Sequence, residues 1–333
     1  MAKMMRAARY FQHGGPEVIS VDHVPVPEPD KGQVLVEIAA AGVAPLDWKM
    51  RAGLLQQYFS LHFPKIPGRD GAGRVVACGT GISRLAPGDR VAVMAPPAGQ
   101  AGTHAEYIVA DADLVVPLPD KLGDDAAAAL INAGLSAWIA VMRTAQVQRG
   151  QRVLVQSGAG AVGGLMVQLC AYLGAEVTAT CRAANADYVR GLGASRVIAY
   201  DGPAVTDLPP QDVVFDLMGG AVHDACYPML APGGHLVWLA AAPITDRSAD
   251  FGVRVTRAMI TDDASVVAEV MKLAAQGVLK PQIADVMPLD QAAEAGQRER
   301  MLGHHRADRA AVAAGLFVDE GGAAAQPDEG GGG

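Results

Sequence analysis

The sequence has 333 residues, of which 50% are hydrophobic, and a formal net charge of −8 at pH 7. A chain of this length and apolar content can bury a sizeable core and is expected to divide into two domains. The acidic balance argues against nucleic acid and against an anionic membrane surface as partners, because both would repel it.

The cysteines and the termini bear on the cellular compartment. The chain has four cysteines, none in a C-x-x-C pair and all in apolar segments: Cys78, Cys170, Cys181 and Cys226. This usage is typical of reduced core residues in a cytoplasmic protein. Residues 1–6 are charged and too short for a signal peptide. The most apolar segment, 126–142, is interrupted by Asn132 and Ser136, so we expect no membrane span and a cytoplasmic location.

The chain up to about residue 121 has the pattern of a β-rich domain. Strand-like runs at 34–38 and 91–93 lie between turns marked by glycine and proline, such as 79–81 and 87–89. Several short strands between such turns predict a small barrel.

From Asp124 the pattern changes to helix, and strands then alternate with helices. Strand-like runs occur at 153–155, 176–181, 197–198, 213–215 and 235–239. This alternation predicts a parallel sheet with helices on both faces. Residues 262–280 have the spacing of an amphipathic helix. The tail from Asp319 to Gly333 is rich in Gly and Ala and is expected to be flexible.

The strand at 153–155 leads into a glycine-rich turn and an apolar helix. Its glycines have the spacing G-x-G-x-x-G, in the order strand, turn, helix that makes this motif meaningful. The first two glycines allow a tight turn and a close approach of backbone N–H groups to a pyrophosphate, and the third lets the helix lie close to the strand. The same spacing also occurs in purely structural turns. We predict a dinucleotide site formed by Ser157, Gly158, Gly160, Ala161, Val162 and Gly163.

The end of the next strand indicates which dinucleotide is bound. An NAD site usually has Asp or Glu there, to accept a hydrogen bond from the ribose 2′-hydroxyl. Neither Thr180 nor Cys181 is acidic, and Arg182 follows them. A guanidinium suits a 2′-phosphate, which favours NADPH. The alternative is that Arg182 is an ordinary solvated arginine.

Eight further stretches carry a family resemblance that extends over roughly residues 5 to 305. They occur at 25–29 (PVPEP), 41–49 (AGVAPLDWK), 66–73 (IPGRDGAG), 87–91 (PGDRV), 102–107 (GTHAEY), 133–138 (AGLSAW), 185–194 (NADYVRGLGA) and 212–216 (DVVFD). With these stretches in this order, the chain resembles the zinc-independent quinone oxidoreductase branch of the medium-chain dehydrogenase/reductases.

The resemblance implies an α/β protein with two domains and the active site in the cleft between them. A GroES-like β-barrel catalytic domain is interrupted by a Rossmann domain with a doubly wound parallel sheet. The expected boundaries are 1–121 and 259–318 for the catalytic domain, 122–258 for the Rossmann domain and 319–333 for the tail. Relatives are homodimers, and we expect the strand at 235–239 and the segment 240–255 to lie at the sheet edge where they join.

The resemblance also allows the metal chemistry to be tested position by position. Zinc-dependent relatives have their ligands at positions that correspond here to Ala44, Arg69 with Asp70, and Asn132. Alanine has no ligand atom and arginine does not bind zinc, whereas a catalytic zinc needs about three protein ligands. We therefore expect no metal. Without a Lewis acid, the expected reaction is hydride transfer to an acceptor that is already electrophilic.

The resemblance further implies roles for individual residues. Ser136 matches a hydroxyl near the nicotinamide carboxamide. Asp47 and Lys49 lie on the loop that borders the cleft, and Tyr58 is near a tyrosine that donates a proton in some enoyl-reducing relatives. Plainer alternatives stay open: a polar helix residue for Ser136, a solvated side chain for Lys49, and a packed loop aromatic for Tyr58.

Three histidines, His62, His104 and His223, have no partner that the sequence identifies and are expected to be structural.

Two features depart from the family. Ala44 stands where relatives commonly have Asn, and the segment 303–309 replaces their usual Gly-Lys ending. The resulting hypothesis is an NADPH-dependent reductase of a small molecule, either a quinone or an α,β-unsaturated carbonyl compound. The alternative is a non-redox lyase or cyclase, or a cofactor-sensing protein, on the same scaffold.

Overall fold

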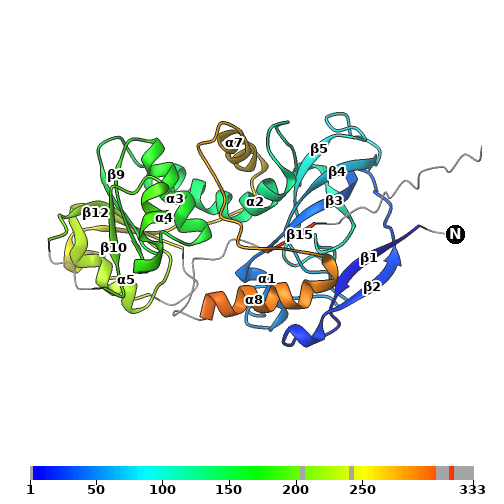
Figure 1. The fold of residues 1–333 in the computed structure, drawn as a ribbon, viewed down its shortest axis with the longest axis horizontal. Coiled ribbons are helices and arrows are strands. Elements are labelled where there is room, and N and C mark those ends of the chain that lie inside the picture. The colour runs from blue at the N-terminus through cyan, green and yellow to red at the C-terminus, as the bar shows by residue number, and fades with distance from the viewer. Residues whose placement is uncertain (1–2, 203–206, 240–243, 305–314, 319–333) are drawn as a thin grey trace, which may run out of the picture.

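The fold is that of a computed structural model, which describes residues 3–202, 207–239, 244–304 and 315–318 (Figure 1). For residues 299–304 and 315–318 only the backbone is considered. The tail from 319 to 333, predicted to be flexible, lies outside the described residues. Two sheets lie at opposite ends of the molecule, and the long helix α2 (Asp124–Trp138) extends between them (Figure 1).

The middle of the chain forms the six-stranded parallel sheet of a Rossmann domain. Its strands have the order β10-β9-β8-β11-β12-β13, so the chain winds outward in both directions from its centre. The central position explains why the β8 strand is fully apolar at Val153, Leu154 and Val155, all 0% exposed. The strands are β8 (Arg152–Val155), β9 (Glu176–Cys181), β10 (Arg196–Ala199), β11 (Gln211–Asp216), β12 (Leu230–Trp238) and β13 (Arg254–Arg257).

One detail of this sheet differs from the expectation for the dimer edge. The strand at 235–239 was expected at the edge, but β12 pairs with β11 on one side and with β13 on the other. The edge strand is β13, which the sequence did not identify as a strand because it is short and polar in its exposed positions.

The GroES-like domain is built on a sheet with the path β14-β15-β3-β4-β5-β7, and a separate hairpin, β1-β2, packs beside it. Strand β3 is long enough that its first half pairs with β6 and its second half with β15. The strands are β1 (Met4–Arg9), β2 (Ser20–Pro25), β3 (Gln33–Val43), β4 (Asp70–Cys78), β5 (Arg90–Met94), β6 (Tyr107–Asp111), β7 (Val115–Pro117), β14 (Val286–Met287) and β15 (Gly315–Val318). The chain thus returns to this sheet after the Rossmann strands. The exact domain boundaries stay predictions.

The remaining helices cover the sheets or connect them. They are α1 (Pro45–Arg51), α3 (Ala161–Tyr172), α4 (Ala186–Gly191), α5 (Ala221–Cys226), α6 (Ser248–Phe251), α7 (Ala264–Ala275) and α8 (Ala292–His304). The predicted amphipathic helix corresponds to α7, which buries Val266, Val267, Val270 and Met271. Asp263 caps its start by accepting hydrogen bonds from the N–H groups of Ser265 and Val266.

Helix α2 continues through π-helical turns to Ala145, and this length corrects one expectation. Over Asp124–Ala145 it is 22 residues long and, by length and composition, apolar enough to cross a membrane, whereas the sequence predicted a shorter segment. Its most apolar stretch is 56% buried inside the protein. The helix packs against β3, β4, α3 and α7. Its apolar character is therefore accounted for by its place in the core that joins the two domains.

Candidate cofactor and active site

The turn between β8 and α3 has the geometry that dinucleotide binding requires. Hydrogen bonds to Thr180 at the end of β9 fix it: the N–H of Ser157 donates to Thr180 Oγ1 at 3.0 Å and the N–H of Gly158 donates to the Thr180 carbonyl at 2.8 Å. Thr180 Oγ1 donates in turn to Gln156 Oε1 at 2.7 Å. Sequence reasoning missed Thr180 and Gln156, because only the pairing of β8 with β9 brings them together.

The glycines of the motif are required by close packing. A Cβ at Gly163 would lie 2.2 Å from the backbone oxygen of Ser157, and one at Gly158 would lie 2.7 Å from Ala179 Cβ. The residue that adopts a left-handed backbone is instead Ser157, with φ of 57°. The glycines of this turn are therefore needed for close packing, whereas its left-handed backbone position carries a serine.

The turn presents unpaired donors at the start of α3. The i→i−4 hydrogen bonds of α3 begin with the one from the Gly164 N–H to the Gly160 carbonyl, at 2.7 Å. The N–H groups of Ala161, Val162 and Gly163 precede it and so have no partner within the helix. Together with the positive end of the helix dipole, these N–H groups are suited to a pyrophosphate, and their role stays a prediction.

The end of β9 carries groups of both charges. Arg182 is half-buried and directly follows the strand. Asp201, which sequence reasoning missed, lies beside it: its carboxylate accepts a hydrogen bond from the Ala183 N–H at 2.8 Å. A cation and a carboxylate therefore both lie where the adenosine ribose of a dinucleotide is expected.

The predicted catalytic residues have different environments. Asp47 is 9% exposed, and its Oδ2 accepts from the Ala44 N–H at 2.8 Å, so the carboxylate caps the start of α1. Lys49 is half-buried, with its ammonium 5.7 Å from the Trp48 ring centre. Tyr58 is 60% exposed on the turn after α1. On α2, Ser136 is 9% exposed. Their roles stay predictions.

Asp47 faces a cluster of buried polar residues in the GroES-like domain that the sequence did not reveal. Asp70 is 5% exposed, its Oδ1 has no hydrogen-bond partner within the described part of the chain, and burial raises the pKa of its carboxyl to about 7. Burial lowers the pKa of Lys65 to about 8, while its ammonium donates to the Gly99 carbonyl. His104 is 3% exposed with Nε2 2.9 Å from the Gly42 carbonyl, which agrees with its expected structural role.

Comparison with known proteins places this geometry in a family. Residues 30–120 match the alcohol dehydrogenase GroES-like domain, and residues 192–306 match the zinc-binding dehydrogenases. A chloroplastic quinone-oxidoreductase homolog from Spinacia oleracea is 35% identical over 73% of this chain and 77% of its own length. An NADPH-dependent alkenal/one oxidoreductase from Arabidopsis thaliana is 35% identical over 72% of this chain and 64% of its own length. The solved quinone oxidoreductase of Coxiella burnetii has a TM-score of 0.83 at 27% identity, covering 95% of this chain and 100% of that one.

The chain belongs to the quinone oxidoreductase branch of the medium-chain dehydrogenase/reductases. The family resemblance inferred from the sequence is thereby confirmed, as is the combination of a GroES-like and a Rossmann domain. The family uses a nicotinamide cofactor, and the turn between β8 and α3 fits one. The choice between NADPH and NADH is not decided by the relatives.

In this chain, Ala44 and Arg69, at two of the positions that correspond to zinc ligands in zinc-dependent relatives, make other contacts. Arg69 donates through Nε to the Ala95 carbonyl at 3.3 Å and through Nη2 to Asp262. Ala44 offers only its backbone, whose N–H is bonded to Asp47. Among the described residues, no group of three or more His, Cys, Asp or Glu side chains is arranged to hold a metal ion.

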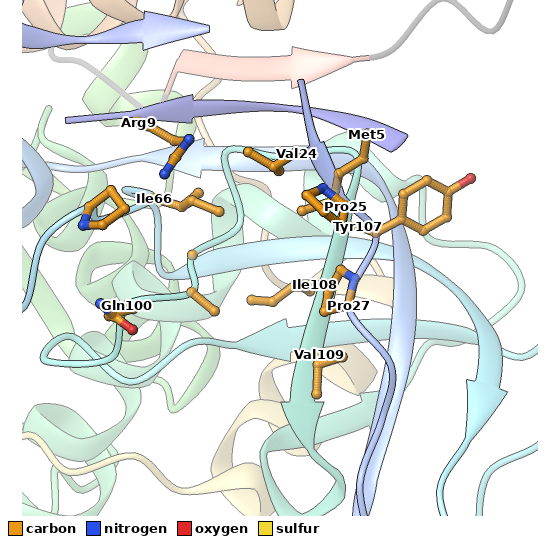
Figure 2. A pocket seen from close by; sticks show the side chains of 13 residues that line it. Met5, Arg9, Val24, Pro25, Pro27, Ile66, Gln100, Tyr107, Ile108 and Val109 are labelled. Carbon is orange, nitrogen blue, oxygen red and sulfur yellow. The ribbon is translucent and has the colours of Figure 1, made fainter. Parts of the chain in front are cut away.

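A pocket of about 270 Å³ lies in the GroES-like domain, between the β1-β2 hairpin and β6. Figure 2 shows Arg9 and Gln100 on one side of it and Pro25 and Pro27 on the other. None of the predicted site residues lines it, so it is separate from the cofactor-binding turn. Its wall includes Gln100, Ala101 and Gly102 of the loop that follows β5.

Proposed function

We propose that this protein is an NADPH-dependent reductase that transfers hydride to a quinone or to the β-carbon of an α,β-unsaturated carbonyl compound. The observation that carries the proposal is the turn between β8 and α3, where glycine is required at 163 and three helix N–H groups are available. The names of the relatives, a quinone-oxidoreductase homolog and an alkenal/one oxidoreductase, support this acceptor class.

The protein's own residues would bind and orient the reactants, while the cofactor when bound supplies the hydride. The turn at 157–163 would hold the pyrophosphate, and the Ser136 hydroxyl would orient the carboxamide. Asp47 holds the start of α1 at the cleft. For the proton that follows hydride transfer, Tyr58 remains the candidate donor; its 60% exposure means that water competes for this role.

The preference for NADPH rests on Arg182 at the end of β9. A guanidinium there can bind a 2′-phosphate with charge-assisted hydrogen bonds. One contact favours NADH instead: the Asp201 carboxylate, bonded to the Ala183 N–H, could accept from a free 2′-hydroxyl. We propose NADPH because the Arg182 guanidinium directly follows β9 and complements the charge of a 2′-phosphate.

We also propose that the reaction needs no zinc. Ala44 supplies no ligand atom, and the Arg69 guanidinium pairs with Asp262, so two of the positions used by zinc-dependent relatives are unsuitable. Catalysis would then depend on the electrophilicity of the acceptor. Metal analysis of the purified protein, with activity measured before and after a chelator, tests this: activity lost to the chelator and restored by zinc contradicts it.

The remaining proposals concern assembly and location. We propose a cytoplasmic homodimer that joins through the exposed edge of β13 (Arg254–Arg257), because an unpaired edge strand is a ready site for pairing with a second copy. Sedimentation of the wild type and of a Val255→Pro variant tests the dimer. Proline removes a strand N–H, and an unchanged dimer would contradict this interface.

The decisive experiment is a fluorescence titration with NADPH and NADH, followed by an acceptor screen that begins with 1,4-benzoquinone and a simple enone. Tighter binding of NADPH and its oxidation by either acceptor are expected. Cofactor binding without turnover on any acceptor would favour a sensing role, and no binding of either nucleotide would favour a non-redox enzyme.

A further inference from the structure

The pocket beside the β1-β2 hairpin lies in a small apolar cluster that is separate from the main core. Its buried members, and the residues packed against them, are Met5, Ala7, Leu35, Ala105 and Tyr107, with Val24, Val26, Ile66, Ala77 and Val109. Side chains alternate along a strand, so Met5, Ala7 and Arg9 of β1 lie on the same face. The pocket is therefore an apolar volume with a cation at one end.

Most of the pocket wall offers no hydrogen bond to a ligand. Three of the residues that line it are prolines, which also lack a backbone N–H: Pro25, Pro27 and Pro64. The Tyr107 hydroxyl is already engaged, since it donates to Glu37 Oε1 and accepts from Lys3 Nζ, both at 2.6 Å. The polar side chains left for a ligand are those of Arg9 and Gln100, which lie on the same side of the pocket (Figure 2).

Arg9 is oriented by its neighbours, but they do not use all of its donors. Its Nη1 donates to Asp22 Oδ2 at 3.3 Å, and its guanidinium lies 4.9 Å from the centre of the Phe11 ring. A guanidinium has several N–H donors in a fixed plane, and within the described part of the chain Nε and Nη2 of Arg9 make no hydrogen bond. Arg9 can therefore donate to a second, anionic partner in a defined geometry.

The size of the pocket and the charge at its end specify the class of ligand. A cavity of about 150 Å³ accepts benzene, so a volume of about 270 Å³ corresponds to roughly ten non-hydrogen atoms. Arg9 is the one charged side chain among the described residues that line the pocket. A single guanidinium that is shared with Asp22 suits a singly charged carboxylate rather than a phosphate group.

We propose that this pocket is a binding site for a small apolar monocarboxylate, with its carboxylate on Arg9 and Gln100 and its hydrocarbon body between the β1-β2 hairpin and β6. Such a ligand contacts three segments that are distant in sequence: the hairpin, β6 and the loop that contains Gln100. Its binding therefore stabilises the folded GroES-like domain. The proposal is independent of the reductase activity, because none of the predicted site residues lines the pocket.

The probe is octanoate, whose size matches that of the pocket, titrated by calorimetry into the full chain. The matched ligand is 1-octanol, which has the same hydrocarbon chain and no charge. We expect saturable binding of octanoate, and binding of octanol that is weaker by about tenfold to 100-fold, because the alcohol lacks the charge-assisted hydrogen bonds of a carboxylate. No saturable binding of octanoate, or equal affinity for the two ligands, overturns the proposal.

Two substitutions change the charge beside the pocket in opposite directions. Arg9→Gln removes the cation and should weaken octanoate by about tenfold to 100-fold, whereas Asp22→Asn removes the competing carboxylate and should tighten octanoate by about three- to tenfold. Arg74→Gln, at an exposed site on β4 outside the pocket, is the control and should bind octanoate as the wild type does. Equal affinity for octanoate in Arg9→Gln and Arg74→Gln contradicts the role of Arg9.

The location of the bound octanoate is tested by NMR of protein labelled at its Ile, Leu and Val methyl groups. Shifts are expected at Val24, Ile66 and Val109, which line the pocket, and not at Val162 at the start of α3. Shifts at Val162 without shifts at the three pocket residues would place octanoate near the cofactor-binding turn and overturn the proposal. Should Arg9→Gln fail to fold, this measurement and the comparison with octanol still decide the matter on the wild type.

Discussion

The two halves of the candidate site are built on different physical grounds. In the Rossmann domain, the turn at 157–163 presents backbone N–H groups for the proposed pyrophosphate, and its requirements are steric and local. In the GroES-like domain, the region around Asp47 depends on buried side chains from distant parts of the chain, including Lys65, Asp70 and His104. The first half is therefore sensitive to side-chain volume, and the second to charge and pH.

The largest expected effect on cofactor affinity comes from adding one carbon atom to the turn. Gly163→Ala would place a Cβ 2.2 Å from the Ser157 backbone oxygen, a contact that only a shift of the main chain can relieve. We expect NADPH affinity to fall by about 100-fold or more, because a shift in the turn misplaces every N–H that faces the pyrophosphate. Gly191→Ala, where a Cβ meets nothing within 4 Å, is the control in a titration by fluorescence. Equal binding by the two variants would contradict the steric argument.

The GroES-like half should instead respond to pH through Asp70. Its carboxyl titrates near pH 7 in the folded protein and near 3.8 when unfolded, so the folded state binds the proton more tightly. The free energy of unfolding should therefore decrease as pH rises from about 4 to about 7, by up to about 4 kcal/mol. Asp70→Asn, which stays neutral, should show a flatter pH dependence and higher stability at pH 7.5.

Urea denaturation at several pH values measures this difference. Asp120→Asn, at an exposed site, is the control and should follow the wild type. Parallel pH curves for the wild type and Asp70→Asn would mean that the buried carboxyl does not titrate in this range.

The difference between a local turn and contacts made by distant residues explains which parts of the site could be predicted from the sequence. The Rossmann turn could be predicted because the spacing of Gly158, Gly160 and Gly163 records a local steric need. The pairing of His223 with Asp216 and the neighbourhood of Asp201 and Ala183 could not, because the first arises when α5 folds back over the end of β11 and the second when the ends of β9 and β10 meet. The raised pKa of Asp70 depends on burial by α2 and β3, which no spacing in the sequence reveals.

The next largest effect is expected on the preference for NADPH over NADH. Arg182→Ala should weaken NADPH by about tenfold to 100-fold, because hydrogen bonds to a charged group contribute about 1.5–3 kcal/mol, while NADH should change little. Asp201→Asn should move the preference further toward NADPH by removing a negative charge near the 2′ position. Arg190→Ala, on the exposed face of α4, is the control. Equal losses for both cofactors in Arg182→Ala would remove the assignment of the 2′-phosphate.

The smallest expected effect concerns the ion pair between Arg69 and Asp262. Arg69 precedes β4 in the GroES-like sheet, and Asp262 lies between β13 and α7, so their ion pair ties that sheet to the segment by which the chain leaves the Rossmann sheet. Their side chains are 14% and 29% exposed, compared with 55% and 99% for Arg190 and Asp187. A double-mutant cycle with Arg69→Gln and Asp262→Asn should give a coupling energy of about 1 kcal/mol, and the exposed pair close to zero, because water screens exposed charges. Measured by urea denaturation, a coupling no larger than that of the exposed pair would show that this ion pair adds no measurable stability to the apolar packing of α2 against α7.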